Sequence, residues 1–349
     1  MDTKKLKALQ WKVFENVAAA QLVPLMRIGD ELGLFRCLAT SGPCDNAAFA
    51  SAAGIHPRYS LEWLCAMCAA GYASYDSEAR HFYLSPEQAA VFADEDSTSL
   101  MIGAYDSLAS LVLDEPKVRA AFVSGEGVAW SDHHPCYFRG TARFFKPVYK
   151  SNLLSRWLPK IPALSEKLEA GGSFADVGCG HGVSTMLIAQ HFPKAKVFGF
   201  DFHGPSIDEA RRLAAEAGLG SRIRYEACSA KDYAGRFDVI SFFDCLHDMG
   251  DPVGAAAHAF RQLNDDGLLV LIEPFAGDSP EENFNVVGQM YYTASTMGCV
   301  PASLAQEVGM ALGAQAGPAK LAIVLQQAGF RDVQTVATTA TNMVLCARK

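Results

Sequence analysis

Residues 174–182, FADVGCGHG, place three glycines at alternate positions behind an acidic residue. The stretch follows a short apolar run and opens a helical segment. Bare backbone N–H groups and the positive end of a helix therefore meet at this loop. Glycine also removes the Cβ atom that would keep a ligand away from the backbone. The pattern is typical of a loop that holds a polar or charged group of a ligand.

The spacing of the loop separates two kinds of nucleotide ligand. A dinucleotide fingerprint needs G-x-G-x-x-G, but Val183 takes the third glycine position and Gly182 comes one residue early. Asp176 precedes the loop, where it would repel a pyrophosphate and would suit a positively charged group. Asp201 ends the next apolar run, 21 residues after Gly180, where a carboxylate can accept hydrogen bonds from ribose hydroxyls. Together they favour a nucleoside with a cationic tail, S-adenosylmethionine.

One histidine is placed to take a proton from an acceptor of a methyl group. His247 lies in LHDM, just after the apolar run 237–243, on the rim where open α/β sheets bind ligands. Histidine titrates near about 6.5, which suits a base at neutral pH. A general base contributes about 10²–10⁴-fold, whereas positioning accounts for up to about 7–11 kcal/mol. His247 is the candidate base, and capping of the following helix is the alternative.

Alternating apolar runs and helical stretches must position these residues. The expected strands are 173–177, 196–201, 222–227, 237–243 and 268–273, and the helices between them are 182–192, 205–218 and 251–263. Such a pattern indicates a parallel sheet covered by helices on both faces. A helix at 319–329 then precedes two adjoining strands, 331–339 and 341–349. They predict a tight hairpin that gives the sheet one antiparallel edge strand.

The first hundred residues have a different pattern. Helical segments at 30–38, 45–54 and 56–71 precede two short strands around a polar turn at 71–85, which predicts a winged helix. Residues 28–100 carry three basic and ten acidic residues, so their surface would repel phosphates. Apolar residues on the helix 56–71 favour a protein neighbour. Dimerisation or support of a substrate lid is therefore expected, and DNA binding is not.

Four motifs resemble the successive motifs of class I S-adenosylmethionine-dependent methyltransferases over residues 140–349. They are FADVGCGHG, GFDF with Asp201, RFDVISFFDCLHDMGDP and LLVLIEPF. With its winged-helix front, the chain resembles the small-molecule O-methyltransferase type. The resemblance implies an α/β fold, a Rossmann-like seven-stranded sheet with a C-terminal antiparallel hairpin, plus an N-terminal mainly helical winged-helix domain. It implies a winged-helix and dimerisation domain (1–100), a helical linker and substrate lid (101–150) and an S-adenosylmethionine-binding domain (151–349).

The resemblance also implies a cofactor site. Asp176, Gly178 and Gly180 would line the methionine end, Asp201 would hold the ribose and Phe202 would lie beside the adenine. The family usually has an aspartate after the third strand; this chain has EACSAKDY there, so Ser229, Ala230 or Lys231 could contact the adenine. Phe243 and Asp244 hold the positions whose carbonyls reach the ligand.

Similar enzymes use a histidine in an H-D-W context as the base. Here His247 is followed by Asp and Met, and Glu273, at the end of the fifth strand, would flank it. A surface or capping role is the alternative for Glu273.

The acceptor side of the site is less defined. His133 and His134 are adjacent, so at most one is expected to point inward, and surface placement is the alternative for both. Tyr291, Met290 and Met297 repeat at helical spacing in 284–298, as a substrate wall or as core. No metal site is predicted, because CAMC (65–68) lacks a second ligand pair; core packing is expected for its cysteines.

Composition limits the class of protein. The 349 residues, half of them hydrophobic, favour two domains, and the formal charge of -8 argues against a nucleic-acid partner. No run of about 18 apolar residues occurs, so no membrane-spanning helix is predicted. The ten cysteines are scattered along the chain and are predicted to be reduced thiols. A cytoplasmic methyltransferase, homodimeric and acting on a small molecule, is expected. Two rivals remain: metal-assisted C-methylation of a 2-oxo acid through His247 with His133 or His134, and a non-catalytic ligand-sensing regulator.

Overall fold

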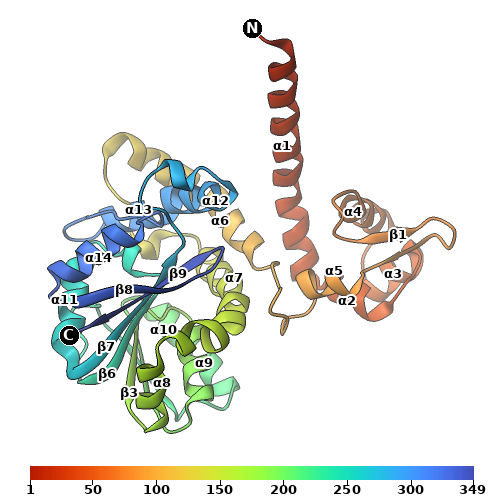
Figure 1. Ribbon diagram of the computed structural model, residues 1–349. Helices are drawn as coiled ribbons and strands as arrows, with labels where there is room; N and C mark the ends of the chain where they lie inside the picture. The colour runs from red at the N-terminus through yellow and green to blue at the C-terminus, as the bar shows by residue number, and fades with distance from the viewer. The chain divides into compact units, whose positions relative to one another are not determined.

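A computed structural model describes all residues from Met1 to Lys349 and divides them into two compact units (Figure 1). One unit comprises Met1–Ala109 and Arg139–Pro147, and the other comprises Ser110–Phe138 and Val148–Lys349. The helices α6 (Ala104–Ser124) and α7 (Cys136–Asn152) belong to both units. Residues 101–150 are thus shared between the units. Among the helices, none combines the length and the apolar character that a membrane span requires.

The first unit contains the winged helix. Its elements are α1 (Thr3–Glu31), α2 (Leu34–Ser41), α3 (Asn46–Ala53), α4 (Pro57–Ala69), β1 (Ser74–Asp76), β2 (His81–Tyr83) and α5 (Pro86–Phe92). Asp45 caps α3 by accepting a hydrogen bond of 2.8 Å from the Ala48 N–H. The amphipathic segment 30–38 is divided between α1 and α2, because Gly33 adopts a left-handed φ of 67° between them.

Helix α4 differs from its sequence-based interpretation. Its apolar side chains Trp63, Leu64 and Met67 are buried in the core of the unit, so they do not form a surface for a protein neighbour. The helix exposes Tyr59, Leu61 and an ion pair between Arg58 and Glu62. The CAMC pair is also not uniformly buried: Cys65 is exposed and Cys68 is half-buried, which makes the expected core packing wrong for Cys65.

The second unit is built on a seven-stranded sheet. The strands are β3 (Ser173–Val177), β4 (Lys196–Asp201), β5 (Ile223–Ala227), β6 (Phe237–Phe243), β7 (Leu263–Pro274), β8 (Arg331–Thr338) and β9 (Asn342–Arg348). Their order is β5-β4-β3-β6-β7-β9-β8. The strands β3 to β7 are mutually parallel, and β9 is antiparallel to both β7 and β8.

The predicted hairpin is present, but its antiparallel strand does not lie at the edge. β9 enters the sheet beside β7 and leaves β8 outside, so the expectation of an antiparallel edge strand is wrong. Burial explains the order. β9 is almost entirely buried, whereas β8 has exposed residues along its length. The more apolar strand takes the interior position, where both of its faces are covered.

Helices cover both faces of the sheet (Figure 1). They are α8 (Pro162–Glu169), α9 (Val183–His191), α10 (Gly204–Glu216), α11 (Pro252–Gln262) and α14 (Pro318–Gln327). Two further helices, α12 (Val286–Ala294) and α13 (Val300–Leu304), lie beyond the ends of the strands. On one face, α11 and α14 share a core with β6, β7 and β9. The carboxyl ends of β3 to β7 meet at one edge, and the strand order reverses between β3 and β6. Open α/β sheets bind ligands at this switch point.

Candidate cofactor and active site

The glycine loop after β3 is built from backbone in the left-handed region. Gly178, Gly180 and Gly182 have φ values of 76°, 51° and 74°. The N–H groups of Gly178 and Cys179 donate to the carbonyl of Phe200 at 2.7 and 3.0 Å, which ties the loop to β4. A Cβ atom added at Gly180 would meet nothing within 4 Å. The loop is therefore anchored on one side and open at Gly180.

Asp176 lies beneath this loop rather than at its mouth. Its carboxylate is completely buried and accepts hydrogen bonds of 2.7 Å from both Ser184 Oγ and Thr185 Oγ1, and one of 3.3 Å from Ser241 Oγ. Burial raises the pKa of Asp176 to about 6, against the effect of these hydrogen bonds. Asp176 thus holds the first turn of α9, and its charge reaches a ligand only through the loop. Direct contact with the methionine end stays a prediction.

Asp201 lies at the mouth of the loop. Its Oδ2 accepts the Gly180 N–H at 2.8 Å, and its Oδ1 accepts the His203 N–H at 2.8 Å. Burial raises the pKa of Asp201, opposed by these two backbone hydrogen bonds. The next side chain, Phe202, is 55 % exposed. The structure thus brings Asp201, Gly180 and an exposed aromatic ring to one place.

The candidates after β5 lie at the same edge of the sheet. Ser229 and Ala230 are half-buried, and Ser229 Oγ accepts the Lys231 N–H at 3.1 Å. The ammonium of Lys231 pairs with Asp251 at 3.2 Å and with Glu307. Because its charge is already paired, Lys231 is the weakest of the three candidates for the adenine contact.

After β6, Phe243 is buried and Asp244 has an unusual backbone conformation, with φ at 51°. The Asp244 carboxylate accepts hydrogen bonds from Tyr149 Oη at 2.6 Å and from Asn342 Nδ2 at 2.8 Å. Burial, and then the charge of Glu273, raise the pKa of Asp244 to about 8. Tyr149 and Asn342 were not predicted, since they lie 95 and 98 residues away along the chain.

His247 and Glu273 form a buried pair. His247 belongs to a 3-10 turn, Leu246–Asp248, and its Nδ1 makes a short hydrogen bond to Oε2 of Glu273. The other carboxylate oxygen of Glu273 accepts the Leu246 N–H at 3.0 Å. Burial alone lowers the pKa of His247, but the carboxylates of Asp248 and Glu273 raise it well above its usual range. The structure thus brings the predicted base and its predicted flanking residue together.

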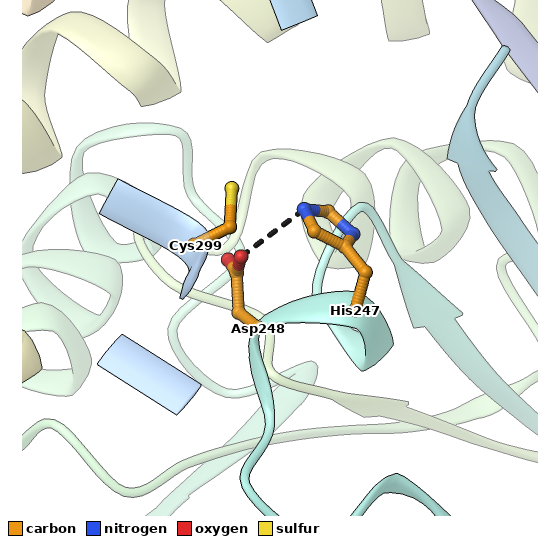
Figure 2. Close-up of side chains that lie close together, drawn as sticks. All are labelled: His247, Asp248 and Cys299. Carbon is orange, nitrogen blue, oxygen red and sulfur yellow. Dashed lines mark ion pairs between the residues drawn. The ribbon is translucent and has the colours of Figure 1, made fainter. Parts of the chain in front are cut away.

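Two further side chains approach the other ring nitrogen of His247 (Figure 2). Nε2 lies 3.1 Å from Asp248 Oδ1. Cys299 ends a π-helical turn, Ser295–Cys299, and its Sγ lies within 4.8 Å of the ligand atoms of both other residues. The cluster contains neither His133 nor His134. Only the adjacency of Asp248 to His247 could have been noticed in the sequence, because Cys299 comes from a distant segment.

The two adjacent histidines differ in placement. His133 is buried, with Nδ1 3.1 Å from Asp114 Oδ2 and its ring centroid 5.1 Å from that of Tyr137. His134 is exposed, with Nδ1 2.9 Å from Cys136 Sγ. The alternative of surface placement therefore applies to His134 and is wrong for His133.

The three residues predicted to form a substrate wall also differ in burial. Tyr291 is buried and donates its hydroxyl proton to the Thr341 carbonyl at 2.7 Å. Met290 is exposed, and Met297 is half-buried. Tyr291 packs with Cys299 in a small apolar cluster, so its ring can line a site beside His247 while its hydroxyl is already used.

Residues 149–335, more than half of the chain, match the family described as Methyltransferase domain. The chain belongs to this methyltransferase family. Residues 20–94 match the Rv2258c-like winged HTH domain, which confirms the predicted winged helix. 

Solved structures share the fold of this methyltransferase over its whole length. Human N-acetylserotonin methyltransferase in complex with S-adenosylmethionine has a TM-score of 0.74 at 17 % identity, covering 100 % of this chain and 99 % of that one. The mitomycin 7-O-methyltransferase MmcR has a TM-score of 0.70 at 17 % identity, covering 100 % of both chains. The predicted fold class is confirmed, and S-adenosylmethionine is the cofactor of this fold.

Curated relatives match the methyltransferase over shorter stretches. A ubiquinone biosynthesis O-methyltransferase from Thiobacillus denitrificans is 33 % identical over 130 residues, 36 % of this chain and 52 % of the relative. A ribosomal RNA small subunit methyltransferase C from Salmonella choleraesuis is 33 % identical over 106 residues, 29 % of this chain and 31 % of the relative. The chain thus spans about half or less of these relatives. Their names point to different acceptors, so the match concerns the methyltransferase domain alone.

Proposed function

We propose that this methyltransferase methylates an oxygen of a small-molecule acceptor, with His247 as general base and Glu273 as the residue that orients it. The observation that carries the proposal is the buried hydrogen bond between His247 Nδ1 and Glu273 at the carboxyl edge of the sheet. The same edge holds the glycine loop. A Cβ atom at Gly178 would lie 2.6 Å from Sγ of Cys245, two residues before the histidine.

The chemistry follows from the two nitrogens of His247. S-adenosylmethionine supplies an electrophilic methyl group on a sulfonium. In the neutral form of His247, Nδ1–H donates a hydrogen bond to Glu273 and Nε2 keeps the lone pair that acts as base. Because the neighbouring carboxylates raise the pKa of His247, this form becomes more populated as pH rises. Nε2 would take the hydroxyl proton while the acceptor oxygen gains the methyl group, and the electron pair of the carbon–sulfur bond would stay on sulfur. Atoms and charge balance, with S-adenosylhomocysteine as the second product.

The cofactor would occupy the open side of the loop. Gly180 offers free space, and Asp201 retains lone pairs for the ribose hydroxyls beside it. The exposed ring of Phe202 offers an apolar surface for the adenine. Ser229 or Ala230 and the carbonyls of Phe243 and Asp244 complete the proposed contacts. Buried charge on Asp176 and Asp201 favours the cationic methionine end.

Replacing the base tests the proposal. In the variant His247→Ala, turnover should fall by about 10²–10⁴-fold, with cofactor affinity nearly unchanged. The loss should shrink for acceptors whose hydroxyl is already ionised, since these need no base. His191→Ala, an exposed histidine at the end of α9, is the matched control. An equal loss with all acceptors, or none, would contradict the role of His247.

A second copy of the chain is the proposed protein partner. The first half of α1 exposes a series of large apolar side chains: Leu9, Trp11, Val13, Phe14 and Val17, each between 50 and 63 % exposed. Exposed apolar surface of this extent marks an interaction site. We therefore retain residues 1–100 as the dimerisation domain, 101–150 as linker and substrate lid, and 151–349 as the cofactor domain, all as proposals.

Nucleic acid is not a proposed partner. Arg58, the basic residue of α4, is paired with Glu62, and Arg36 pairs with Glu95 at 3.8 Å. Paired arginines on an acidic surface offer little to a phosphate backbone. Sequence-specific DNA binding at physiological salt would restore the regulator alternative.

The proposed compartment is the cytoplasm. All ten cysteines are free thiols in the structure. Thiols of this number persist unpaired in reducing surroundings. Fractionation of cells followed by immunodetection would test the assignment.

A further inference from the structure

We propose that His247, Asp248 and Cys299 form a binding site for a divalent transition-metal ion such as Zn²⁺. Their ligand atoms, an imidazole nitrogen, a carboxylate oxygen and a thiol sulfur, all lie within 4.8 Å of one another (Figure 2). Zinc binds these three ligand types at about 2.0–2.3 Å, so tetrahedral ligands stand roughly 3.3–3.6 Å apart. The His247 to Asp248 distance of 3.1 Å is close to that requirement.

The surroundings of His247 are those of a metal-binding histidine. A ligating histidine almost always donates its second ring N–H to a carboxylate or carbonyl, which fixes the ring and its tautomer. Here Glu273, itself buried, occupies Nδ1 and leaves Nε2 facing Asp248 and Cys299. The candidate ligands Asp248 and Cys299 therefore lie on the Nε2 side of the imidazole ring, and Glu273 lies on the Nδ1 side.

Asp248 supplies an independent observation. Its Oδ1 atom is buried but takes part in no hydrogen bond, although Nε2 of His247 lies 3.1 Å away. Its ion pair with His247 exists only while the ring is protonated, and a buried carboxylate oxygen left without a partner is costly. A cation between Asp248 and Cys299 would satisfy it.

Neighbouring residues hold the two parts of the cluster together. Gln306 donates to the Asp248 carbonyl at 3.1 Å and accepts the Gly250 N–H at 3.1 Å. Ser303 Oγ donates to the Met249 carbonyl at 2.8 Å. Because α13 starts directly after Cys299, these bonds join the segment of the third ligand to the turn of the first two. The site is thus arranged before an ion arrives.

Charge and proton balance favour an ion of charge +2. A neutral imidazole, a carboxylate and a thiolate together carry two negative charges, which a divalent ion cancels in a buried place. Cys299 must give up its thiol proton to solvent, and His247 must give up any proton on Nε2, so ion binding releases protons and weakens as pH falls. Three protein ligands leave a fourth position for water or an acceptor oxygen, as in catalytic zinc sites.

Occupation of Nε2 has a consequence for the reaction. A nitrogen bonded to a metal cannot accept a proton, so Zn²⁺ should inhibit the base-assisted transfer. This consequence rests on the proposed function, whereas metal binding itself does not.

Cobalt titration of the metal-free full chain tests the site. We expect one equivalent of Co²⁺ to bind with thiolate-to-cobalt absorption, and Zn²⁺ to displace it. Cys299→Ser should abolish that absorption, and Asp248→Asn and Glu273→Gln should weaken binding, the latter by about 10–100-fold. Cys346→Ser, a half-buried thiol in β9, is the matched control and should bind as the parent does.

Two results would overturn the site. One is the absence of thiolate absorption in the parent protein, and the other is parental binding in Cys299→Ser. Should that variant not fold, parental affinity in both Asp248→Asn and Glu273→Gln would be equally decisive. Methyl transfer measured with a chelator present is a separate readout: transfer without cobalt binding removes only the metal site, and cobalt binding without transfer removes only the proposed function.

Discussion

At the scale of residues, buried carboxylates organise the carboxyl edge of the sheet. Asp176, Asp201, Asp244 and Glu273 each hold a neighbouring backbone or side-chain group there. Burial raises the pKa of Asp176, of Asp201 and of Asp244, so these groups lack a favourable counter-charge in the ligand-free protein. A cationic ligand relieves that cost, which is why this edge suits a sulfonium compound.

Asp201 should be the residue on which cofactor affinity depends most. The variant Asp201→Ala removes the ribose acceptor and also the partner of the Gly180 and His203 N–H groups. Because a hydrogen bond to a charged group contributes about 1.5–3 kcal/mol, affinity for S-adenosylhomocysteine should fall roughly 10–100-fold. Calorimetric titration measures this loss. Asp208→Ala, an exposed carboxylate on α10, should change nothing, and an unchanged affinity in Asp201→Ala would contradict the ribose contact.

The pKa of Asp176, raised by burial to about 6, predicts that cofactor affinity depends on pH. Below that value the carboxyl group is neutral and no longer attracts the cation. Affinity should therefore rise from pH 5 to pH 7 and then level off, by at most about tenfold per pH unit. Asp176→Asn should bind weakly and with a flatter pH profile. A profile of the same shape in both proteins would assign the effect to another group.

The raised pKa of Asp176 has the opposite effect on the stability of the ligand-free protein, which should fall as pH rises. The folded pKa of about 6 lies above the ordinary value of 3.8, so the folded state holds the proton more tightly. The stabilisation is complete below about pH 4 and is lost as pH rises through 6, by about 3 kcal/mol. Urea unfolding at pH 5 and pH 8 should show about half of this loss, about 1.4 kcal/mol, in the parent and a smaller change in Asp176→Asn.

At the scale of elements, two glycines of the loop after β3 are required for different reasons. Gly182 is needed for folding, and Gly180 is needed for the proposed cofactor contact. Gly182 has φ of 74°, and an added Cβ would lie 2.8 Å from Cζ of the buried Tyr225. Gly182→Ala should therefore cost about 2–4 kcal/mol of stability. Gly180→Ala meets only the backbone penalty of about 1–2 kcal/mol, but its methyl group would occupy the proposed cofactor space. Thermal unfolding and calorimetry should show stability lost mainly in the first variant and affinity in the second.

The sequence predicted the elements better than their neighbours in space. Apolar runs and glycines located the strands and the loop, because burial on both faces and left-handed turns leave local signals. The order of β9 and β8 was not predicted, since it depends on which hairpin strand is more buried. Cys299 beside His247 was missed for a related reason. Contacts between distant segments have no periodicity to reveal them, and the same applies to Asn342 on Asp244.

At the scale of the whole molecule, the two units have different proposed roles. The second unit holds the residues proposed for cofactor, base and metal, and its family is established by the match over 149–335. The first unit carries the winged helix and the exposed apolar side chains of α1. The proposed self-association would therefore be a property of the first unit, and substitutions there can test it without changing a residue of the proposed cofactor site.

Charge placed on α1 should abolish self-association. The double variant Trp11→Glu with Phe14→Glu puts two carboxylates where two rings are each 63 % exposed. Burying such charges at an apolar interface is costly, so the mass by light scattering should fall from that of a dimer to that of a monomer. Lys12→Glu changes charge on the same helix without removing apolar surface and should remain dimeric. A monomeric parent protein would exclude the dimer.

The place of β9 has a consequence for biosynthesis. Of the seven strands, it is the last to leave the ribosome, yet it pairs along β7 from Leu268 to Pro274 and separates β7 from β8. Until it emerges, the nascent chain carries an apolar strand edge with no neighbour, and β8 has nothing to join. Messages truncated before codon 342 should thus yield products that aggregate and are degraded, rather than partially active enzyme.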